Sequence, residues 1–199
     1  MPVEVISFLL SGEDKGKRLQ FQIILQCAPL LKGIKAACII NIDKQHCGEI
    51  EGILEGTDIE YKILMVKEEK CLVIFYRRQE LSIYLENNEV REYLEHCGYV
   101  CQNLEKVLWR LSARVCQYCC RGAGFPHEIG AFLEYPVDDV KAFIEREGRG
   151  ELLSGYWKVY HNPGKALMTF LAYDKARTSA VNEFLTGRSI KEIASTALY

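Results

Sequence analysis

The fold is decided by residues 61–77, which read YKILMVKEEKCLVIFYR. Residues 61–66 and 71–77 are rich in β-branched and aromatic side chains, which is typical of strands. The four polar residues between them, Lys67-Glu68-Glu69-Lys70, form a short turn, so the segment predicts an antiparallel hairpin. Upstream, residues 36–42 (AACIINI) lie between Gly33 and Asp43 and predict a further buried strand.

Helical spacing of apolar residues dominates the rest of the chain. Residues 20–31 predict a helix that ends or kinks at Ala28, because Pro29 disfavours helical geometry in the residue before it. A short helix is expected over residues 47–54, and Asn88 is expected to cap a helix over 89–96. A longer helix carries a stripe of apolar residues and ends near Gly122: Leu104, Val107, Leu108, Leu111 and Val115.

Two short helices are expected to begin at Pro126 and Pro136, since proline suits the first position of a helix. A long helix is predicted over residues 165–184. The capping box Ser189-Ile190-Lys191-Glu192 predicts a last short helix. Residues 156–161 alternate around Trp157 and Val159 and predict a fourth strand with Trp157 in the core.

These elements predict an α/β (α+β) fold, in which helices pack on a small mixed sheet of about four strands that includes one antiparallel hairpin. The length of 199 residues and a hydrophobic content of 49% suit a single globular domain over residues 1–199. A net charge of -2 argues against nucleic-acid binding. The C-terminal segment 187–194 begins like a helix-turn-helix but leaves too few residues for a recognition helix.

Membrane insertion and export are not expected. The apolar runs at 5–10 and 72–76 are far shorter than the ~20 residues of a spanning helix. The N-terminus has Glu4 where a secretory signal would carry positive charge. The nine cysteines are odd in number and scattered, which favours a reduced cytoplasm, no structural disulfide and nine free thiols.

Several motifs occur in order along the chain. Residues 125–130 read FPHEIG, and they are followed by Phe132-Leu133, Tyr135-Pro136, Asp139-Val140 and Trp157-Lys158-Val159-Tyr160. Together with Cys27-Ala28-Pro29 and Lys35, these motifs resemble a bacterial and archaeal family catalogued as domain of unknown function 3793. The resemblance covers about residues 20–173. It implies a fold and a candidate site but no activity.

The chain departs from that family pattern at two positions. Glu134 stands where the pattern has glycine, and Ala142 stands where a second glycine is common. A glycine that is needed for close backbone approach cannot simply become glutamate. Either the contact is dispensable in this chain or the chain is a divergent member.

His127 and Glu128 are the leading candidate site residues, because an imidazole can act as a general base or metal ligand and a carboxylate can assist it. Adjacent helical residues point about 100° apart, so the alternative is that Glu128 stabilises a helix N-terminus and His127 binds a loop carbonyl. Cys27 is a second candidate, as a nucleophile or soft ligand. Its alternative role is that of a small core residue.

Weaker candidates are a cysteine cluster that could bind a metal or react as thiols, and three basic side chains that could bind a ligand. Cys116, Cys119 and Cys120, followed by His127, suggest a metal site but lack the second pair that a zinc site normally shows. A ligand is expected to meet three basic side chains: Lys35, Arg77 and Lys158.

Two classes of function follow from these candidates. The first is a cytosolic binding or accessory protein for an unknown small molecule or protein, with its site around FPHEIG. The second is a thiol- or metal-dependent enzyme that uses Cys27, His127 and Glu128, with no cofactor identified. If the site is functional, His127 is expected to be partly exposed in a concavity, with Cys27 or Lys35 across from it.

Overall fold

The computed structural model describes residues 15–101 and 103–195. The strands are β1 (Ala37–Asp43), β2 (Ile59–Lys67), β3 (Lys70–Arg77), β4 (Leu153–Ser154) and β5 (Lys158–Val159). The helices are α2 (Lys15–Leu31), η1 (Lys44–Glu49), α3 (Ile50–Leu54), α4 (Arg78–Leu85), α5 (Asn88–His96), α6 (Leu104–Arg121), α7 (Ile129–Phe132), α8 (Val137–Glu145), α9 (Pro163–Leu185) and α10 (Ile190–Ser195).

The predicted hairpin is confirmed, and its second strand, β3, is the central strand of the main sheet. β2 and β3 pair antiparallel, and β1 pairs with the other edge of β3, which gives the order β1-β3-β2. β3 is therefore buried on both faces. Because side chains alternate along a strand, its residues divide between two hydrophobic clusters. Cys71, Val73 and Phe75 belong to one cluster, and Leu72, Ile74 and Tyr76 to the other.

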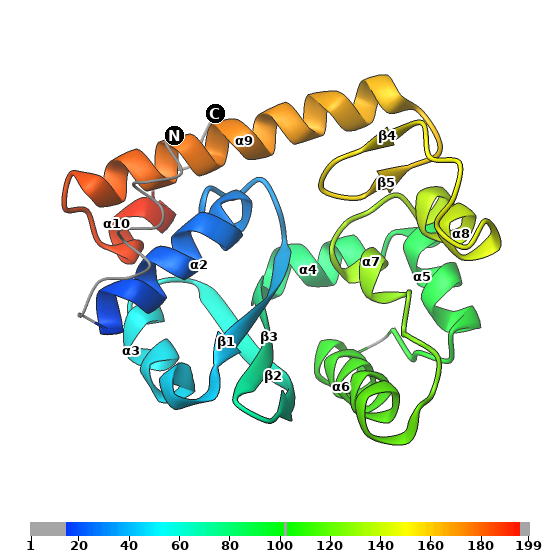
Figure 1. The fold of residues 1–199 in the computed structure, drawn as a ribbon, viewed down its shortest axis with the longest axis horizontal. Helices are drawn as coiled ribbons and strands as arrows, with labels where there is room; N and C mark the ends of the chain where they lie inside the picture. The colour runs from blue at the N-terminus through cyan, green and yellow to red at the C-terminus, as the bar shows by residue number, and fades with distance from the viewer. Residues whose placement is uncertain (1–14, 102, 196–199) are drawn as a thin grey trace.

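Helices cover the two faces of this sheet. α2, α9 and α10 pack on one face, where Phe21 and Phe184 stack with ring centroids 5.8 Å apart. Residues of α4, α5, α6 and α7 pack on the other face. The long helix α9 extends along the molecule, with α2 beside one end and the β4–β5 hairpin beside the other (Figure 1). The prediction of helices packed on a small sheet is confirmed.

The predicted fourth strand belongs to a separate structure. β5 pairs antiparallel with β4 in a two-stranded sheet, and the Gly155 N–H donates to the Trp157 carbonyl at 3.1 Å across the turn. The sheet of β1, β2 and β3 is antiparallel throughout, so the prediction of one mixed four-stranded sheet is wrong in that detail. A strand partner only a few residues away in sequence closes a smaller loop than the distant sheet would require. Trp157 and Val159 are buried, as predicted.

The helix boundaries need three corrections. The cap of α5 is Asn87, which accepts the Glu89 N–H at 3.1 Å, and not Asn88. The helix predicted over residues 47–54 begins earlier, as the 3-10 helix η1 at Lys44. Of the two outcomes predicted at Ala28, an end or a kink, the end is wrong, since α2 continues through Pro29 to Leu31.

The structure also differs from the sequence prediction at Pro126 and in one helix, α4, that was not predicted. Pro136 precedes α8 by one residue, close to the expected position. Pro126 begins a turn and not a helix, because the Ile129 N–H donates to the Pro126 carbonyl at 3.0 Å before α7 starts. α4 is absent from the predicted elements. The predicted capping box is confirmed, with the Ser189 N–H donating to Glu192 at 2.8 Å.

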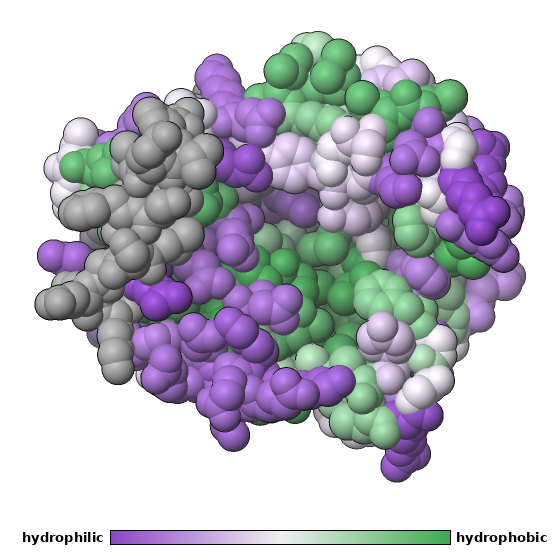
Figure 2. Space-filling model, viewed as in Figure 1, coloured by the Kyte–Doolittle hydropathy of each residue, from purple (hydrophilic) through white to green (hydrophobic). Residues whose placement is uncertain are grey.

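Surface hydropathy is uneven on the face seen in Figure 2. Hydrophobic residues line a hollow near the middle of this face, and others gather at the upper edge, where the N-terminal half of α9 lies in Figure 1. Exposed apolar residues of that half are Leu167, Met168 and Leu171. None of the helices within residues 15–101 and 103–195 combines the length and apolar composition of a membrane span. The predicted apolar run at 5–10 lies outside the described residues.

Candidate functional site

The FPHEIG segment folds into a turn that sends neighbouring side chains in different directions. α6 ends at Gly122, whose φ of 66° is the left-handed conformation that glycine adopts without strain. Residues 126–130 then form consecutive turns, in which the Gly130 N–H donates to the His127 carbonyl at 3.0 Å. His127 is half-buried on one side of this turn, whereas Glu128 is 4% exposed on the other.

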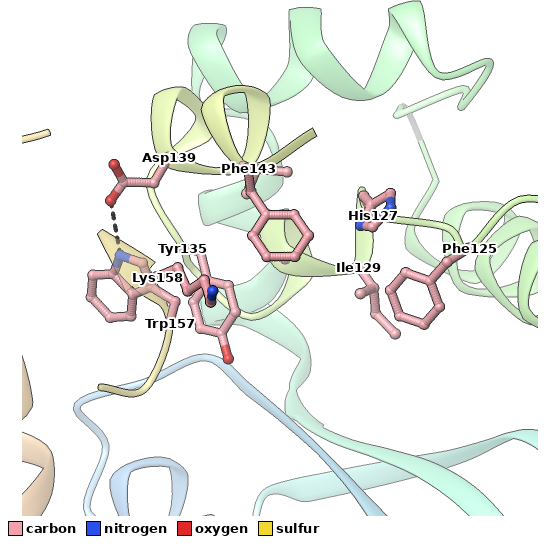
Figure 3. Close-up of a pocket in the computed structure, with 10 residues that line it drawn as sticks. Phe125, His127, Ile129, Tyr135, Asp139, Phe143, Trp157 and Lys158 are labelled. Atoms are coloured by element: carbon pink, nitrogen blue, oxygen red, sulfur yellow. Dashed lines mark hydrogen bonds between the residues drawn. The ribbon is translucent and has the colours of Figure 1, made fainter. Parts of the chain in front are cut away.

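His127 faces a cavity of about 280 Å³, as predicted for a functional turn. The cavity lies where the FPHEIG turn, α8 and β5 meet (Figure 3). Its lining is mostly aromatic and aliphatic, with three polar side chains. The lining residues are Phe125, His127, Ile129, Gly130, Tyr135, Asp139, Val140, Phe143, Trp157 and Lys158.

Aromatic rings form two groups along this cavity. The His127 ring contacts Phe125 and Phe143, with centroids 5.1 Å and 5.4 Å away. At the other end Tyr135 stacks on Trp157 at 5.2 Å and an interplanar angle of 29°. Among the described residues, no side chain or backbone group forms a hydrogen bond with the His127 ring nitrogens. These nitrogens are therefore available to a ligand.

Asp139 holds the Trp157 end of the cavity in place. Its carboxylate is 2% exposed and accepts the Trp157 indole N–H at 2.8 Å (Figure 3). It also accepts the backbone N–H groups of Tyr160 and His161, each at 2.9 Å. A buried carboxylate is stable only when hydrogen bonds replace its hydration, and here both oxygens are occupied. Asp139 thus fixes β5 to α8 and has little capacity left for a ligand.

Lys158 lines the same cavity, and its ammonium group contacts two residues a short distance before it in the chain. It donates to the Gly148 carbonyl at 2.6 Å and pairs with Glu151 at 3.1 Å. Its side chain remains 38% exposed. An ammonium group has three N–H donors, so one is left for a further acceptor.

The structure separates Glu128 from the site predicted for it. Its carboxylate accepts from the Arg114 guanidinium at 2.9 Å and from the Tyr99 hydroxyl at 3.1 Å. Although Glu128 occupies the cap position of α7, its side chain makes no capping bond. Glu128 therefore connects α6 to α7 and does not share a site with His127.

Cys27 and Lys35 lie apart from the His127 cavity as well. Cys27 is fully buried in α2. The Lys35 ammonium lies 5.5 Å from the ring centroids of both Tyr135 and Tyr173. Burial lowers the pKa of Lys35, and the neighbouring Cys38, Glu134 and Cys27 oppose this shift. Tyr135 lies between Lys35 and the His127 cavity, so neither predicted partner meets His127.

Arg77 is buried and joins separate parts of the chain through hydrogen bonds. It is 7% exposed, its Nε donates to the Leu30 carbonyl at 3.3 Å, and one Nη donates to the Leu31 carbonyl at 3.2 Å. It also pairs with Asp58 and contacts the Ala194 carbonyl at 3.4 Å. These contacts place Arg77 at the end of α2 and not in a ligand cavity.

The cysteines at the end of α6 do not gather around a common point. Cys116 is directed to the sheet, where its thiol contacts the Leu64 carbonyl at 3.6 Å, while Cys120 is exposed. Within the described parts of the chain, no group of three or more His, Cys, Asp or Glu side chains could hold a metal ion. Cys116, Cys119, Cys120 and His127 therefore lack the arrangement of a metal centre.

Residue patterns missed three members of the cavity. Tyr135, Asp139 and Phe143 have ordinary helical or turn roles in the sequence, and only the packing of α8 against β5 brings them to His127. The available signal was the Tyr-Pro and Asp-Val motifs themselves, which accompany FPHEIG and Trp-Lys-Val-Tyr along the chain.

Comparisons with known proteins give a family and no activity. The search of curated proteins and the search of solved structures find no match. Residues 23–194 match one family. This range includes the FPHEIG turn, α8 and the β4–β5 hairpin, which together form the cavity. The chain belongs to the family described as Protein of unknown function (DUF3793).

Proposed function

We propose that this protein binds a small, flat, mainly apolar ligand in the His127 cavity. The observation that carries the proposal is a cavity of about 280 Å³ walled by aromatic side chains, with unoccupied imidazole nitrogens at one side. Ligand sites are typically apolar concavities with a few polar groups that fix orientation. His127 and Lys158 are those polar groups.

The chemistry of the walls defines the ligand class. Offset-stacked or edge-on rings next to Trp157, Tyr135, Phe125 and Phe143 favour an aromatic ligand over an aliphatic one of equal size. The imidazole of His127 can donate to or accept from one hydroxyl or carbonyl group. The proposed ligand is an aromatic ring that carries one such polar substituent.

The alternative, a thiol- or metal-dependent enzyme that uses Cys27, His127 and Glu128, has less support. Cys27 is sealed in α2 and Glu128 is bound to Arg114, so the three side chains do not converge. A binding or accessory role in the cytoplasm agrees with the nine free thiols.

Three probes of similar size test the proposed ligand class: p-cresol, toluene and cyclohexanol. Binding measured by saturation-transfer NMR and calorimetry should be tightest for p-cresol, which supplies both a ring and a hydroxyl group. His127→Phe should remove the advantage of p-cresol over toluene, a loss of about threefold to tenfold for one hydrogen bond. Equal affinity for all three probes would contradict the proposed role of His127.

A blocking variant locates the binding. Ile129→Trp adds bulk to a residue that lines the cavity and should abolish binding of p-cresol. Ile144→Trp is the matched control, because Ile144 is 44% exposed on α8 outside the cavity lining. Binding that survives Ile129→Trp, or that is lost equally in Ile144→Trp, would place the ligand elsewhere.

A further inference from the structure

A second cavity, of about 490 Å³, lies against β1 and shares one lining residue, Tyr135, with the His127 cavity. Residues 38–40 of β1 line it together with side chains of α2 and α9. Two of the described residues that line it are basic, Lys35 and Arg177, and none is acidic. The lining of this cavity is therefore positively charged.

The two basic side chains lie beside one group of aromatic rings. The Lys35 ammonium is 5.5 Å from the ring centroids of Tyr135 and Tyr173. The Tyr173 ring packs edge-on against Tyr156 at 5.0 Å, and the Arg177 guanidinium lies 5.2 Å from the Tyr156 centroid. Tyr135 and Tyr156 line the cavity as well. These contacts place both cations at the same aromatic wall.

The charges of Lys35 and Arg177 are compensated to different extents. The Nε of Arg177 donates to the Leu25 carbonyl at 3.2 Å, and one Nη pairs with Asp174 at 3.5 Å. The Lys35 ammonium forms no hydrogen bond or ion pair with any residue in the described parts of the chain. The cavity therefore carries one uncompensated positive charge, that of Lys35.

Ring contacts alone do not satisfy the Lys35 ammonium. The faces of Tyr135 and Tyr173 attract its charge but supply no oxygen or nitrogen acceptor for its three N–H donors. Burial accordingly lowers the pKa of Lys35, although Cys38 and Glu134 oppose this shift. The Glu134 carboxylate accepts the Ala36 N–H at 2.8 Å and forms no ion pair with Lys35. A half-buried cation of this kind is stabilised when an anion replaces its lost hydration.

We propose that this cavity binds an organic monocarboxylate with an aliphatic body, whose carboxylate pairs with Lys35. One negative charge matches the single uncompensated ammonium, whereas a phosphate monoester would add a second negative charge near Glu134. The apolar lining residues Leu25, Ile39 and Leu133 suit the aliphatic body. The proposal uses no property of the His127 cavity and is independent of the aromatic ligand proposed there.

Three probes with the same six-carbon chain length test the ligand class: hexanoate, hexanamide and hexyl phosphate. Calorimetry at pH 7 should show that hexanoate binds about tenfold more tightly than hexanamide, because its carboxylate makes a charge-assisted hydrogen bond. Hexyl phosphate should bind more weakly than hexanoate. In Lys35→Met the preference for hexanoate over hexanamide should disappear. Lys141→Met is the matched control and should keep it, since Lys141 also lies over a tyrosine ring, that of Tyr93.

Methyl NMR of the wild-type protein locates the hexanoate. With isoleucine methyl groups labelled, hexanoate should shift the signals of Ile39 and Ile40, which line the cavity at β1. Ile129 lines the His127 cavity and Ile144 is 44% exposed on α8, so their signals should stay in place. A shift of Ile129 without shifts of Ile39 and Ile40 would place hexanoate in the His127 cavity and overturn the proposal.

The binding measurements have their own contradicting outcomes. Equal affinity for hexanoate and hexanamide, tighter binding of hexyl phosphate, or a preference for hexanoate that persists in Lys35→Met would each overturn the proposal. Circular dichroism shows whether Lys35→Met is folded before its affinities are compared. If that variant does not fold, the three affinities and the methyl shifts of the wild-type protein decide the question.

Discussion

At the scale of single residues, a side-chain hydrogen bond of Glu134 offsets the free-energy cost of its backbone conformation. Glu134 has a φ of 56°, a left-handed conformation that glycine adopts freely and that costs other residues about 1 kcal/mol or more. The family resemblance implies a glycine at this position, and the backbone conformation explains such a glycine better than close approach does. The Glu134 carboxylate accepts the Ala36 N–H at 2.8 Å and so gains a contact that glycine lacks.

Trp157 is the residue with the largest expected effect on stability. It is 9% exposed, packs edge-on against Phe170 at 4.6 Å and donates to Asp139. Trp157→Ala should lower the free energy of unfolding by ~3–5 kcal/mol, as large-to-small core substitutions do. Urea denaturation measures the change. Trp109→Ala is the control, because Trp109 is 68% exposed and its loss should change stability by only about 0.5 kcal/mol.

At the scale of secondary-structure elements, one helix can supply a hydrogen-bond donor that another helix lacks. Pro29 lies inside α2 and has no N–H to give to the Leu25 carbonyl four residues earlier. Arg177 of α9 supplies the missing donor, with its Nε 3.2 Å from that carbonyl. The Lys32 N–H then donates to the Ala28 carbonyl at 2.9 Å, and the helix continues. The contact with α9 therefore explains why Pro29 does not end α2.

A double-mutant cycle between Pro29 and Arg177 tests this explanation. Arg177→Ala should destabilise the wild-type protein, because the Leu25 carbonyl loses its donor. In the Pro29→Ala background the new backbone N–H at position 29 replaces that donor, so the same substitution should cost less. The expected difference is about 0.5–1.5 kcal/mol, the net value of one hydrogen bond, measured by urea denaturation. Identical costs in both backgrounds would mean that Arg177 stabilises α2 in another way.

At the scale of the whole molecule, buried ionic contacts join the end of α2 to α9 and α10. Lys32, the residue after α2, is 1% exposed and donates to Glu183 of α9 at 2.5 Å and to the Ile193 carbonyl of α10 at 3.3 Å. Glu183 also accepts from Ser179 at 2.9 Å and from Arg188 at 3.0 Å. These contacts close the C-terminal helices over α2.

The stability of the molecule should depend on pH through Glu183. Burial acts to raise the pKa of Glu183, but hydrogen bonds from Lys32, Ser179 and Arg188 outweigh it and lower the pKa to about 2. A carboxyl whose pKa is lower in the folded state stabilises the protein above its unfolded pKa, near 4.5. This stabilisation, on the order of 3 kcal/mol, is lost as the pH falls from about 4.5 to 2.

Urea denaturation of Glu183→Gln between pH 7 and pH 2 measures this contribution. The variant should be less stable than the wild type at pH 7, and the difference should shrink as the pH approaches 2. Glu86→Gln, at an exposed position, is the control for general acid effects. A constant difference between the wild type and Glu183→Gln across this range would show that Glu183 does not titrate as inferred.

The sequence by itself determined the features that depend on local patterns. Two runs rich in β-branched and aromatic residues with a polar turn between them specify the β2–β3 hairpin, helical spacing specifies α6 and α9, and Ser189 with Glu192 specifies the start of α10. It also singled out the FPHEIG segment that carries His127. Each of these features depends on residues within a few positions of one another, where spacing and side-chain chemistry set the backbone.

Only the tertiary structure decided which of the singled-out side chains meet. The neighbours His127 and Glu128 turn to opposite sides, since Arg114 and Tyr99 hold the carboxylate of Glu128 in the interior. Cys27 and Cys38 lie in the same hydrophobic cluster because α2 packs on β1. Asp139 reaches Trp157 across 18 positions of the chain. Such contacts depend on how distant elements pack, and a buried charge must take whichever donors that packing brings within reach, which no local spacing reveals.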